Sequence, residues 1–273
     1  MPAGGRLAGK VAIVTGAGSR TSGMIGTGRA MAVLFAREGA RVCVLDLELE
    51  RAEETASLIE AEGGESMVVA GDVSLAADCE RVVTETVTRY GGLDVLVNNA
   101  ALSASDSGTR GRVHELDQSG WERIFAVNLE GAMLMSKHAL PRMIETGGGS
   151  IVSIASVAAL MSDGLVPAYA AAKAGLVRLT ADIAVSYGRD GIRANTIVPG
   201  MLFTGRQGEL SPERAEQRRR AAPLGIEGDA WDVAWAAVYL ASDEARFVTG
   251  VCLPVDGGLL QTQPLTALRL LDN

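Results

Sequence analysis

Tyr169 and Lys173 are the two residues of this sequence best suited to proton transfer. They lie four residues apart in Pro167–Tyr187, whose many alanines and leading proline predict a helix, so both side chains project from one face. An ammonium beside a phenol stabilises the phenolate and lowers a pKa that is normally about 10. A tyrosine tuned in this way can act as a general acid for a ketone or a general base for an alcohol. Taken alone, the spacing is more often that of an exposed helix surface.

Two more residues strengthen this interpretation. Ser156 lies 13 residues before Tyr169, just after a predicted strand, and could hold the reacting oxygen beside the phenol. Asn128 heads the helix that we predict at Leu129–Glu145. On its own, Asn128 would be interpreted as the N-cap of that helix.

A glycine-rich segment indicates a second function, the binding of a dinucleotide. Gly16 and Gly18 follow the first predicted strand, and Gly26 and Gly28 open the next helix. Glycines are needed where a turn is tight and where backbone N–H groups approach a pyrophosphate at a helix N-terminus. Asp46 ends the second strand, 18 residues beyond Gly28, where a carboxylate can accept hydrogen bonds from ribose hydroxyls. Each signal is weak alone, and the two together favour a dinucleotide site.

Further candidates for the same site end the third and fourth strands. The segment Asn98-Asn99-Ala100-Ala101 ends the fourth strand, and we select Asn98 and Ala100 from it as cofactor-binding residues. In a doubly wound sheet the first and fourth strands are neighbours, so their loops open onto one crevice. Asp72 and Val73 follow the third strand. Asp72 could bind the adenine amino group or simply cap the turn.

The elements that position these residues alternate regularly along the chain. This β-α-β pattern predicts a single α/β domain with a doubly wound, Rossmann-type parallel sheet of about seven strands and helices on both faces. The predicted strands are Val11–Thr15, Arg41–Asp46, Glu65–Ala70, Leu93–Val97, Ser150–Ile154, Arg193–Val198 and Val251–Val255. The predicted helices are Arg29–Glu38, Glu48–Glu62, Leu75–Tyr90, Leu129–Glu145, Pro167–Tyr187 and Asp229–Leu240.

Three segments do not fit the alternation. Leu102–Glu115 is polar and rich in glycine and serine, which predicts a surface loop. Residues 199–228 are predicted to form a long substrate-binding loop, because loops of this length in α/β domains are usually functional. The tail, residues 261–273, contains several leucines and is expected to reach a neighbouring subunit.

Composition excludes several classes of partner. The 273 residues carry a net charge of −8, which disfavours nucleic acid and anionic membranes. No run of 18 apolar residues occurs, so we expect a soluble, cytoplasmic protein. Three separated cysteines, Cys43, Cys79 and Cys252, are expected to be free thiols, and two histidines are too few to suggest a metal site.

From Lys10 to Gly258 the chain resembles the short-chain dehydrogenase/reductase family. The resemblance rests on the glycine segment, the fourth-strand asparagines, and Asn128, Ser156, Tyr169 and Lys173 in the family's order, followed by Pro199-Gly200, Thr204, Pro223-Leu224-Gly225, Val248-Thr249-Gly250 and Val255-Asp256-Gly257-Gly258.

This resemblance implies a role for each residue of a catalytic tetrad. Tyr169 would transfer the proton, Ser156 would position the oxygen, and Asn128 would hold a water in a proton relay. Lys173 would bind the nicotinamide ribose and tune Tyr169. Thr204 would lie near the nicotinamide carboxamide, with Pro199 also at the cofactor, and the resemblance further implies a homotetramer.

The chain departs from the family pattern in two places. Ala101 replaces a usual glycine, and Gly16 and Gly26 are ten residues apart rather than four. The longer segment, with Ser22 as a further cofactor candidate, resembles the branch that contains bacterial enoyl reductases. Those enzymes separate their tyrosine and lysine more widely and lack this serine.

We expect NAD to be the cofactor, because Asp46 would repel the 2′-phosphate of NADP. Arg20 is the competing feature, since a basic residue in the glycine segment can bind that phosphate. The leading hypothesis is therefore an NAD-dependent enzyme that interconverts a small secondary alcohol and a ketone. The alternatives are an enoyl-thioester reductase and a non-catalytic dinucleotide-binding protein.

Overall fold

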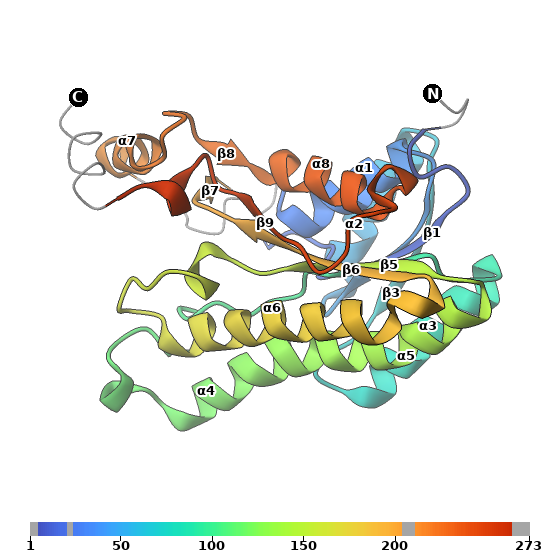
Figure 1. The fold of residues 1–273 in the computed structure, drawn as a ribbon, viewed down its shortest axis with the longest axis horizontal. Coiled ribbons are helices and arrows are strands. Elements are labelled where there is room, and N and C mark those ends of the chain that lie inside the picture. Colours follow the sequence, from blue (N-terminus) through green and yellow to red (C-terminus); the bar gives the residue numbers. More distant parts are fainter. Residues whose placement is uncertain (1–4, 21–23, 204–210, 264–273) are drawn as a thin grey trace.

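Seven parallel strands form one sheet in the computed structural model, which describes residues 5–20, 24–203 and 211–263 (Figure 1). Their order across the sheet is β3-β2-β1-β4-β5-β6-β9. Their bounds are β1 Val11–Thr15, β2 Arg41–Asp46, β3 Glu65–Ala70, β4 Val95–Asn98, β5 Gly149–Ile154, β6 Ile192–Pro199 and β9 Cys252–Val255. The predicted doubly wound sheet of seven strands is confirmed.

Helices cover both faces of this sheet, as predicted (Figure 1). On one face, buried apolar side chains join the sheet to α1 Thr27–Arg37, α2 Leu49–Ala61 and α8 Ala230–Ala241. On the other face, a second buried cluster joins it to α3 Ala76–Tyr90, α5 Gly131–Glu145 and α6 Pro167–Tyr187. Short 3-10 turns occur at Val113–Glu115, Val157–Ala159, Gly188–Asp190, Asp243–Ala245 and Leu259–Gln261.

The first strand shows how the sequence produces this arrangement. All five residues of β1 are buried; Ala12 and Val14 pack into one apolar cluster, and Val11 and Ile13 into the other. A strand covered on both faces needs apolar residues at every position, which is the run that the sequence contains. β1 pairs with β2 on one side and β4 on the other, so the winding direction reverses there. The loops after β1 and β4 therefore flank one crevice.

The prediction that a helix begins near Leu129 is wrong. The helix begins at α4, Gln118–Phe125, passes through a π-helical turn, Ala126–Glu130, and continues directly into α5. Asp117 starts it, because its Oδ2 accepts a hydrogen bond from the Gly120 N–H at 2.8 Å. Asn128 therefore lies inside a helix and does not cap one.

The segment 199–228 is not the continuous loop that we predicted. It contains β7 Leu202–Phe203, α7 Pro212–Ala221 and the start of β8 Gly228–Asp229, and β7 pairs with β8. α7 buries none of its residues, so its sequence has no apolar periodicity from which a helix could be predicted. Its local signals are Ser211 at the N-cap, Pro212 at the first position, Glu213 in the first turn and three arginines in the last turn.

No helix among the described residues is long and apolar enough to cross a membrane. Residues 264–273, with the leucines of the predicted intersubunit tail, lie outside the described part of the chain.

The start of α1 provides a test of the fold. A Cβ on Gly28 would lie 2.0 Å from the Gly16 carbonyl oxygen, so Gly28→Ala must displace backbone. We expect it to lower the free energy of unfolding by about 1–3 kcal/mol or more, measured by urea denaturation. Gly188→Ala is the control: Gly188 has φ −61° and nothing within 4 Å of its Cβ position. It should stabilise the protein by up to about 1 kcal/mol. Equal stability of Gly28→Ala and wild type would contradict the described contact.

Candidate active site

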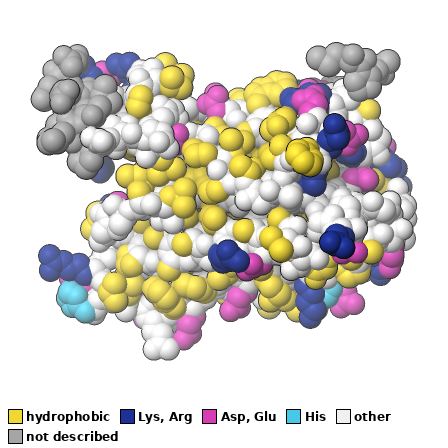
Figure 2. Space-filling view, in the orientation of Figure 1, with side chains coloured by type: hydrophobic (Ala, Val, Ile, Leu, Met, Phe, Trp, Pro, Cys, Tyr) yellow, Lys and Arg dark blue, Asp and Glu magenta, His cyan; other side chains and the backbone are white. Residues whose placement is uncertain are grey.

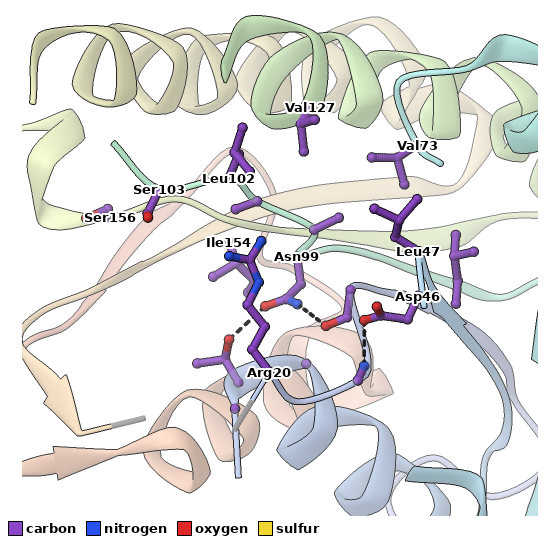
Figure 3. A pocket seen from close by; sticks show the side chains of 18 of the residues that line it. Arg20, Asp46, Leu47, Val73, Asn99, Leu102, Ser103, Val127, Ile154 and Ser156 are labelled. Carbon is purple, nitrogen blue, oxygen red and sulfur yellow. Dashed lines mark hydrogen bonds between the residues drawn. The ribbon is translucent and has the colours of Figure 1, made fainter. Parts of the chain in front are cut away.

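A cleft of about 670 Å³ lies where the strands end at their carboxyl edge. It is lined by the segments that follow β1, β2, β3, β4, β5 and β6, together with the first turns of α1 and α6 (Figure 3). The volume is within the range of cavities that hold small molecules and cofactors. The crevice predicted from the strand order is therefore present.

Gly16 and Asn99 join the two central turns of this cleft. Gly16 has φ +61°, and a Cβ there would lie 2.8 Å from the Ala100 Cα, so the turn requires glycine. Asn99 Nδ2 donates to the carbonyl oxygens of Thr15 and Gly16, each at 2.9 Å, and its Oδ1 accepts from Thr27 Oγ1 at 2.8 Å (Figure 3). One amide side chain thus fixes the glycine turn against the start of α1.

Asn98 and Asn99 point to opposite faces of the sheet, because side chains alternate along a strand. Asn98 is buried on the α5 side, where its Nδ2 donates to Ser136 Oγ at 3.2 Å. It lines a small separate cavity and not the main cleft. The structure therefore does not place this predicted cofactor residue with the others. Asn99, which was not among the predicted cofactor residues, faces the cleft instead. The alternation of side chains along a strand allows only one of these two neighbouring asparagines to do so.

Asp46 lines the cleft at the end of β2, as predicted. Its Oδ2 accepts from the Gly18 N–H at 2.9 Å, and its Oδ1 accepts from the Glu48 N–H at 3.2 Å. Two backbone donors therefore orient the carboxylate, and each oxygen retains a lone pair for a ligand.

Asp72 has the turn-capping role that the sequence left open, and it also lines the cleft. Its Oδ1 accepts from the Ser74 N–H at 2.8 Å and from Ser74 Oγ at 2.7 Å, which makes it the cap of the turn after β3. Asp72 also lines the cleft, together with Val73 and Ala100. Contact between Asp72 and an adenine stays a prediction.

Ser156, Tyr169 and Lys173 come together at the end of the cleft formed by β5 and α6. Lys173 is 2% exposed; its Nζ donates to the Ile154 carbonyl oxygen at 2.6 Å and lies 5.9 Å from the centroid of the Tyr169 ring. Ser156 begins a 3-10 turn, where its Oγ accepts from the Ala158 N–H at 3.2 Å. The predicted grouping of a hydroxyl, a phenol and an ammonium is present on one wall.

Asn128 does not line the main cleft but holds a segment that does. It is 1% exposed; its Oδ1 accepts from the Leu102 N–H at 2.7 Å and its Nδ2 donates to the Leu102 carbonyl oxygen at 2.9 Å. The π-helical turn projects Asn128 toward this backbone, and such turns are frequent at functional sites. A contact between Asn128 and a relay water stays a prediction.

The remaining predicted cofactor residues divide into two groups. Gly26, the N-cap of α1, and Pro199, at the end of β6, both line the cleft. Ser22 and Thr204 lie outside the described residues.

Arg20 crosses the cleft to the loop that follows β4. Its Nη1 lies 2.5 Å from Asp106 Oδ2, and Figure 3 shows the side chain extending toward Leu102 and Ser103, away from Asp46. Burial would raise the pKa of the Asp106 carboxyl, but hydrogen bonds from Ser103 and the charge of Arg20 outweigh it and lower that pKa to about 2. Asp106 is therefore ionised at neutral pH and pairs with Arg20 at the loop after β4.

The two buried cysteines are not suited to act as nucleophiles. Cys43 and Cys79 are buried free thiols, and burial raises the pKa of Cys43 to about 12 and that of Cys79 to about 11. A thiol must ionise to act as a nucleophile, so neither is reactive near neutral pH. No group of three or more metal-ligating side chains occurs in the described ranges.

Comparison with known proteins identifies the family. A family model described as enoyl-(acyl carrier protein) reductase matches residues 23–260. A 2-(S)-hydroxypropyl-CoM dehydrogenase of Xanthobacter autotrophicus is 37% identical over 93% of this chain and 98% of its own. A 2,5-dichloro-2,5-cyclohexadiene-1,4-diol dehydrogenase of Sphingobium indicum is 37% identical over 93% of this chain and 97% of its own. The crystal structure of a protein described as a short-chain dehydrogenase/reductase from Burkholderia xenovorans has a TM-score of 0.88 at 42% identity, covering 95% of this chain and 99% of that one. The chain belongs to the short-chain dehydrogenase/reductase family and is an oxidoreductase.

Gly26 offers a test that separates binding from folding. The nearest atoms to a Cβ at Gly26 would be 3.9 Å away, so Gly26→Ala should fold with an unchanged unfolding midpoint. The added methyl would occupy the cleft beside the N-terminus of α1, where a diphosphate is expected. We expect NADH affinity, measured by fluorescence titration, to fall at least about tenfold, equivalent to about 1.4 kcal/mol. Wild-type affinity in this variant would mean that the diphosphate binds elsewhere.

Proposed function

We propose that this chain is an NAD-dependent enzyme that interconverts a secondary alcohol and a ketone by hydride transfer. One observation carries the proposal: Ser156, Tyr169 and Lys173 line the same cleft as Asp46 and the glycine turn. A proton-transfer group and groups suited to a dinucleotide therefore share one cavity. The similarity to a hydroxypropyl-CoM dehydrogenase and a cyclohexadiene-diol dehydrogenase supports chemistry at a CH–OH group.

The residues of the cleft fit a nicotinamide dinucleotide, which supplies the hydride acceptor when it is bound. The backbone N–H groups of the first turn of α1, beside Gly26, would hold the diphosphate. Asp46 would accept hydrogen bonds from the adenosine ribose hydroxyls, with Asp72 and Val73 near the adenine. Pro199 would lie toward the nicotinamide end, beside Lys173 and Tyr169.

The protein's own groups then move the proton. Tyr169 takes the hydroxyl proton of the alcohol as the hydride leaves the carbinol carbon, and it returns that proton in the reverse direction. The Ser156 hydroxyl holds the substrate oxygen near the phenol. Lys173 favours the phenolate form of Tyr169 through its positive charge. Asn128, anchored to the backbone of Leu102, would hold a relay water.

The surroundings of Tyr169 favour an apolar substrate. Leu160, Met161 and Leu165 lie in the segment between Ser156 and Tyr169 and are 51%, 44% and 41% exposed. Exposed apolar side chains in the segment that leads to Tyr169 would provide a surface that a hydrocarbon skeleton can cover. A screen that follows NADH absorbance, beginning with cyclic and aromatic secondary alcohols, tests this substrate class.

An enoyl-thioester reductase is the second candidate, favoured by the description of the matching family model and by the long glycine segment. The spacing of Tyr169 and Lys173 on one helix, with Ser156 in the cleft, favours carbonyl chemistry instead. Consumption of NADH with an enoyl thioester but with no ketone would support the second candidate. A non-catalytic dinucleotide-binding protein would turn over neither compound.

Assembly and location stay predictions. A homotetramer is expected from the resemblance. Apolar side chains reach the surface on the face that carries α5 and α6 (Figure 2), and the exposed side chains of Met133 and Ile144 on α5 and Val185 on α6 would be covered by a second copy. A cytoplasmic location is expected from the sequence.

Tyr169→Phe should lower kcat by at least about two to three orders of magnitude, because it removes the general acid and base. NADH affinity and thermal stability should change little, since only one hydroxyl is lost. Tyr187→Phe is the matched control, with the same chemical change at the far end of α6. Near-normal turnover by Tyr169→Phe would contradict the proposed mechanism.

The cofactor preference follows from Asp46. A 2′-phosphate would meet this carboxylate directly, while Arg20 is held by Asp106 on the other side. We expect kcat/KM to favour NAD over NADP by at least about tenfold, which needs only about 1.4 kcal/mol of discrimination. Steady-state kinetics with both cofactors measure the ratio, and a wild-type preference for NADP would overturn the assignment.

A further inference from the structure

Arg51 lies beside Asp46 in the cleft and takes no part in the function proposed above. It is a half-buried residue in the first turn of α2 and lines the same cavity. A Cβ on Gly18 would lie 2.5 Å from Arg51 Cβ and 2.8 Å from Asp46 Oδ2. Both side chains therefore pack beside one glycine at the same end of the cleft.

The backbone at Arg51 is fixed to the glycine turn. Its carbonyl oxygen accepts from Arg29 Nη2 at 3.4 Å and lies 3.3 Å from Thr55 Oγ1. Arg29 is buried in α1, and its Nε donates to Thr55 Oγ1 at 2.9 Å. Thr55 Oγ1 also lies 2.9 Å from the Ala17 carbonyl oxygen, to which it can donate. This network ties α2 to the turn, so Arg51 is held at the cleft.

Arg20 and Arg51 both line the cleft, and they differ in their partners. Arg20 is engaged by Asp106, whereas Arg51 makes no ion pair in the part of the chain that the structure describes. A guanidinium presents several N–H donors in a plane that matches the oxygens of a phosphate. Arg51 thus keeps the donors that a phosphate on the adenosine ribose would need.

We propose that Arg51 is a second determinant of dinucleotide choice, a latent binding group for the 2′-phosphate of NADP. While Asp46 is ionised, its charge repels that phosphate. When the carboxylate is removed, Arg51 binds the phosphate and the preference reverses. The inference rests on the proposed function, which assigns the adenosine end of the cleft to Asp46.

The test measures binding of adenosine 5′-monophosphate and adenosine 2′,5′-bisphosphate by calorimetry, without turnover. Asp46→Asn removes the charge but retains an oxygen that can accept from the Gly18 N–H. In wild type we expect the monophosphate to bind more tightly. In Asp46→Asn the bisphosphate should bind at least about tenfold more tightly than the monophosphate, as a charge-assisted contact allows.

Two double variants isolate the contribution of Arg51. In Asp46→Asn with Arg51→Gln, the advantage of the bisphosphate should fall below about threefold, while monophosphate affinity stays unchanged. Asp46→Asn with Arg189→Gln is the control for net charge, because Arg189 is exposed and does not line the cleft. It should keep the full advantage. Asp46→Ser provides a second background if the Asn variant does not fold.

Three results would overturn the inference. In the first, neither Asp46 variant binds the bisphosphate more tightly than the monophosphate. In the second, Arg51→Gln leaves the higher affinity for the bisphosphate intact. In the third, Arg51→Gln weakens the binding of both nucleotides equally, which would make Arg51 an adenine contact. These outcomes leave the proposed alcohol oxidation untouched. Tighter binding of the bisphosphate by wild type would instead overturn the proposed NAD preference.

Discussion

The hydrogen bond from Lys173 Nζ to the Ile154 carbonyl oxygen is the contact on which the site depends. At 2.6 Å it joins α6 to the last residue of β5, inside the protein, where an ammonium without acceptors would be costly. Ser156 follows two residues after Ile154, and Tyr169 lies one helical turn before Lys173. One buried contact therefore sets the relative position of the hydroxyl, the phenol and the ammonium. The positive charge of Lys173 would also favour the phenolate form of Tyr169, on which the proposed proton transfer depends.

The opposite part of the cleft depends on close backbone packing rather than on charge. Gly16, Gly18 and Gly28 each occupy a position where a Cβ would lie within 3 Å of another group. Asn99 then ties the glycine turn to the loop after β4. Together these contacts bring the ends of two strands together at the reversal point of the sheet. The sheet thus places the glycine turn and the side chains of Tyr169 and Lys173 around one cavity.

Features governed by local periodicity could be predicted from the sequence. The strands of the central sheet were found because buried parallel strands are short apolar runs between amphipathic helices, and Pro167 marked the start of α6. Tyr169, Lys173 and Ser156 were found because they lie close in sequence around one strand and one helix. α7 was missed because it buries no residue. The early start of α4 was missed although Asp117 caps it and Trp121, Ile124 and Phe125 recur at helical spacing.

Features governed by contacts between distant residues could not be predicted. Arg20 and Asp106 are separated by 86 positions, so nothing local indicates that they pair. Arg51 resembled any charged residue of an exposed helix until the structure placed it over Gly18. Asn128 was assigned to a helix N-terminus, although its amide instead clamps the backbone of Leu102. From the sequence we selected Arg20 and Asn128 but neither Asp106 nor Arg51, because only tertiary packing brings the last two beside residues of the site.

The central claim is that a hydride passes between a carbinol carbon and a nicotinamide held in this cleft. Its most direct test is isotope transfer from a secondary alcohol deuterated at the carbinol carbon, with NAD as acceptor and the product analysed by NMR. The account predicts one deuterium on a single face of nicotinamide C4, with transfer slowed in parallel with turnover by Tyr169→Phe. Reduced cofactor without deuterium, or reduction of an enoyl thioester with no exchange between alcohol and ketone, would contradict it.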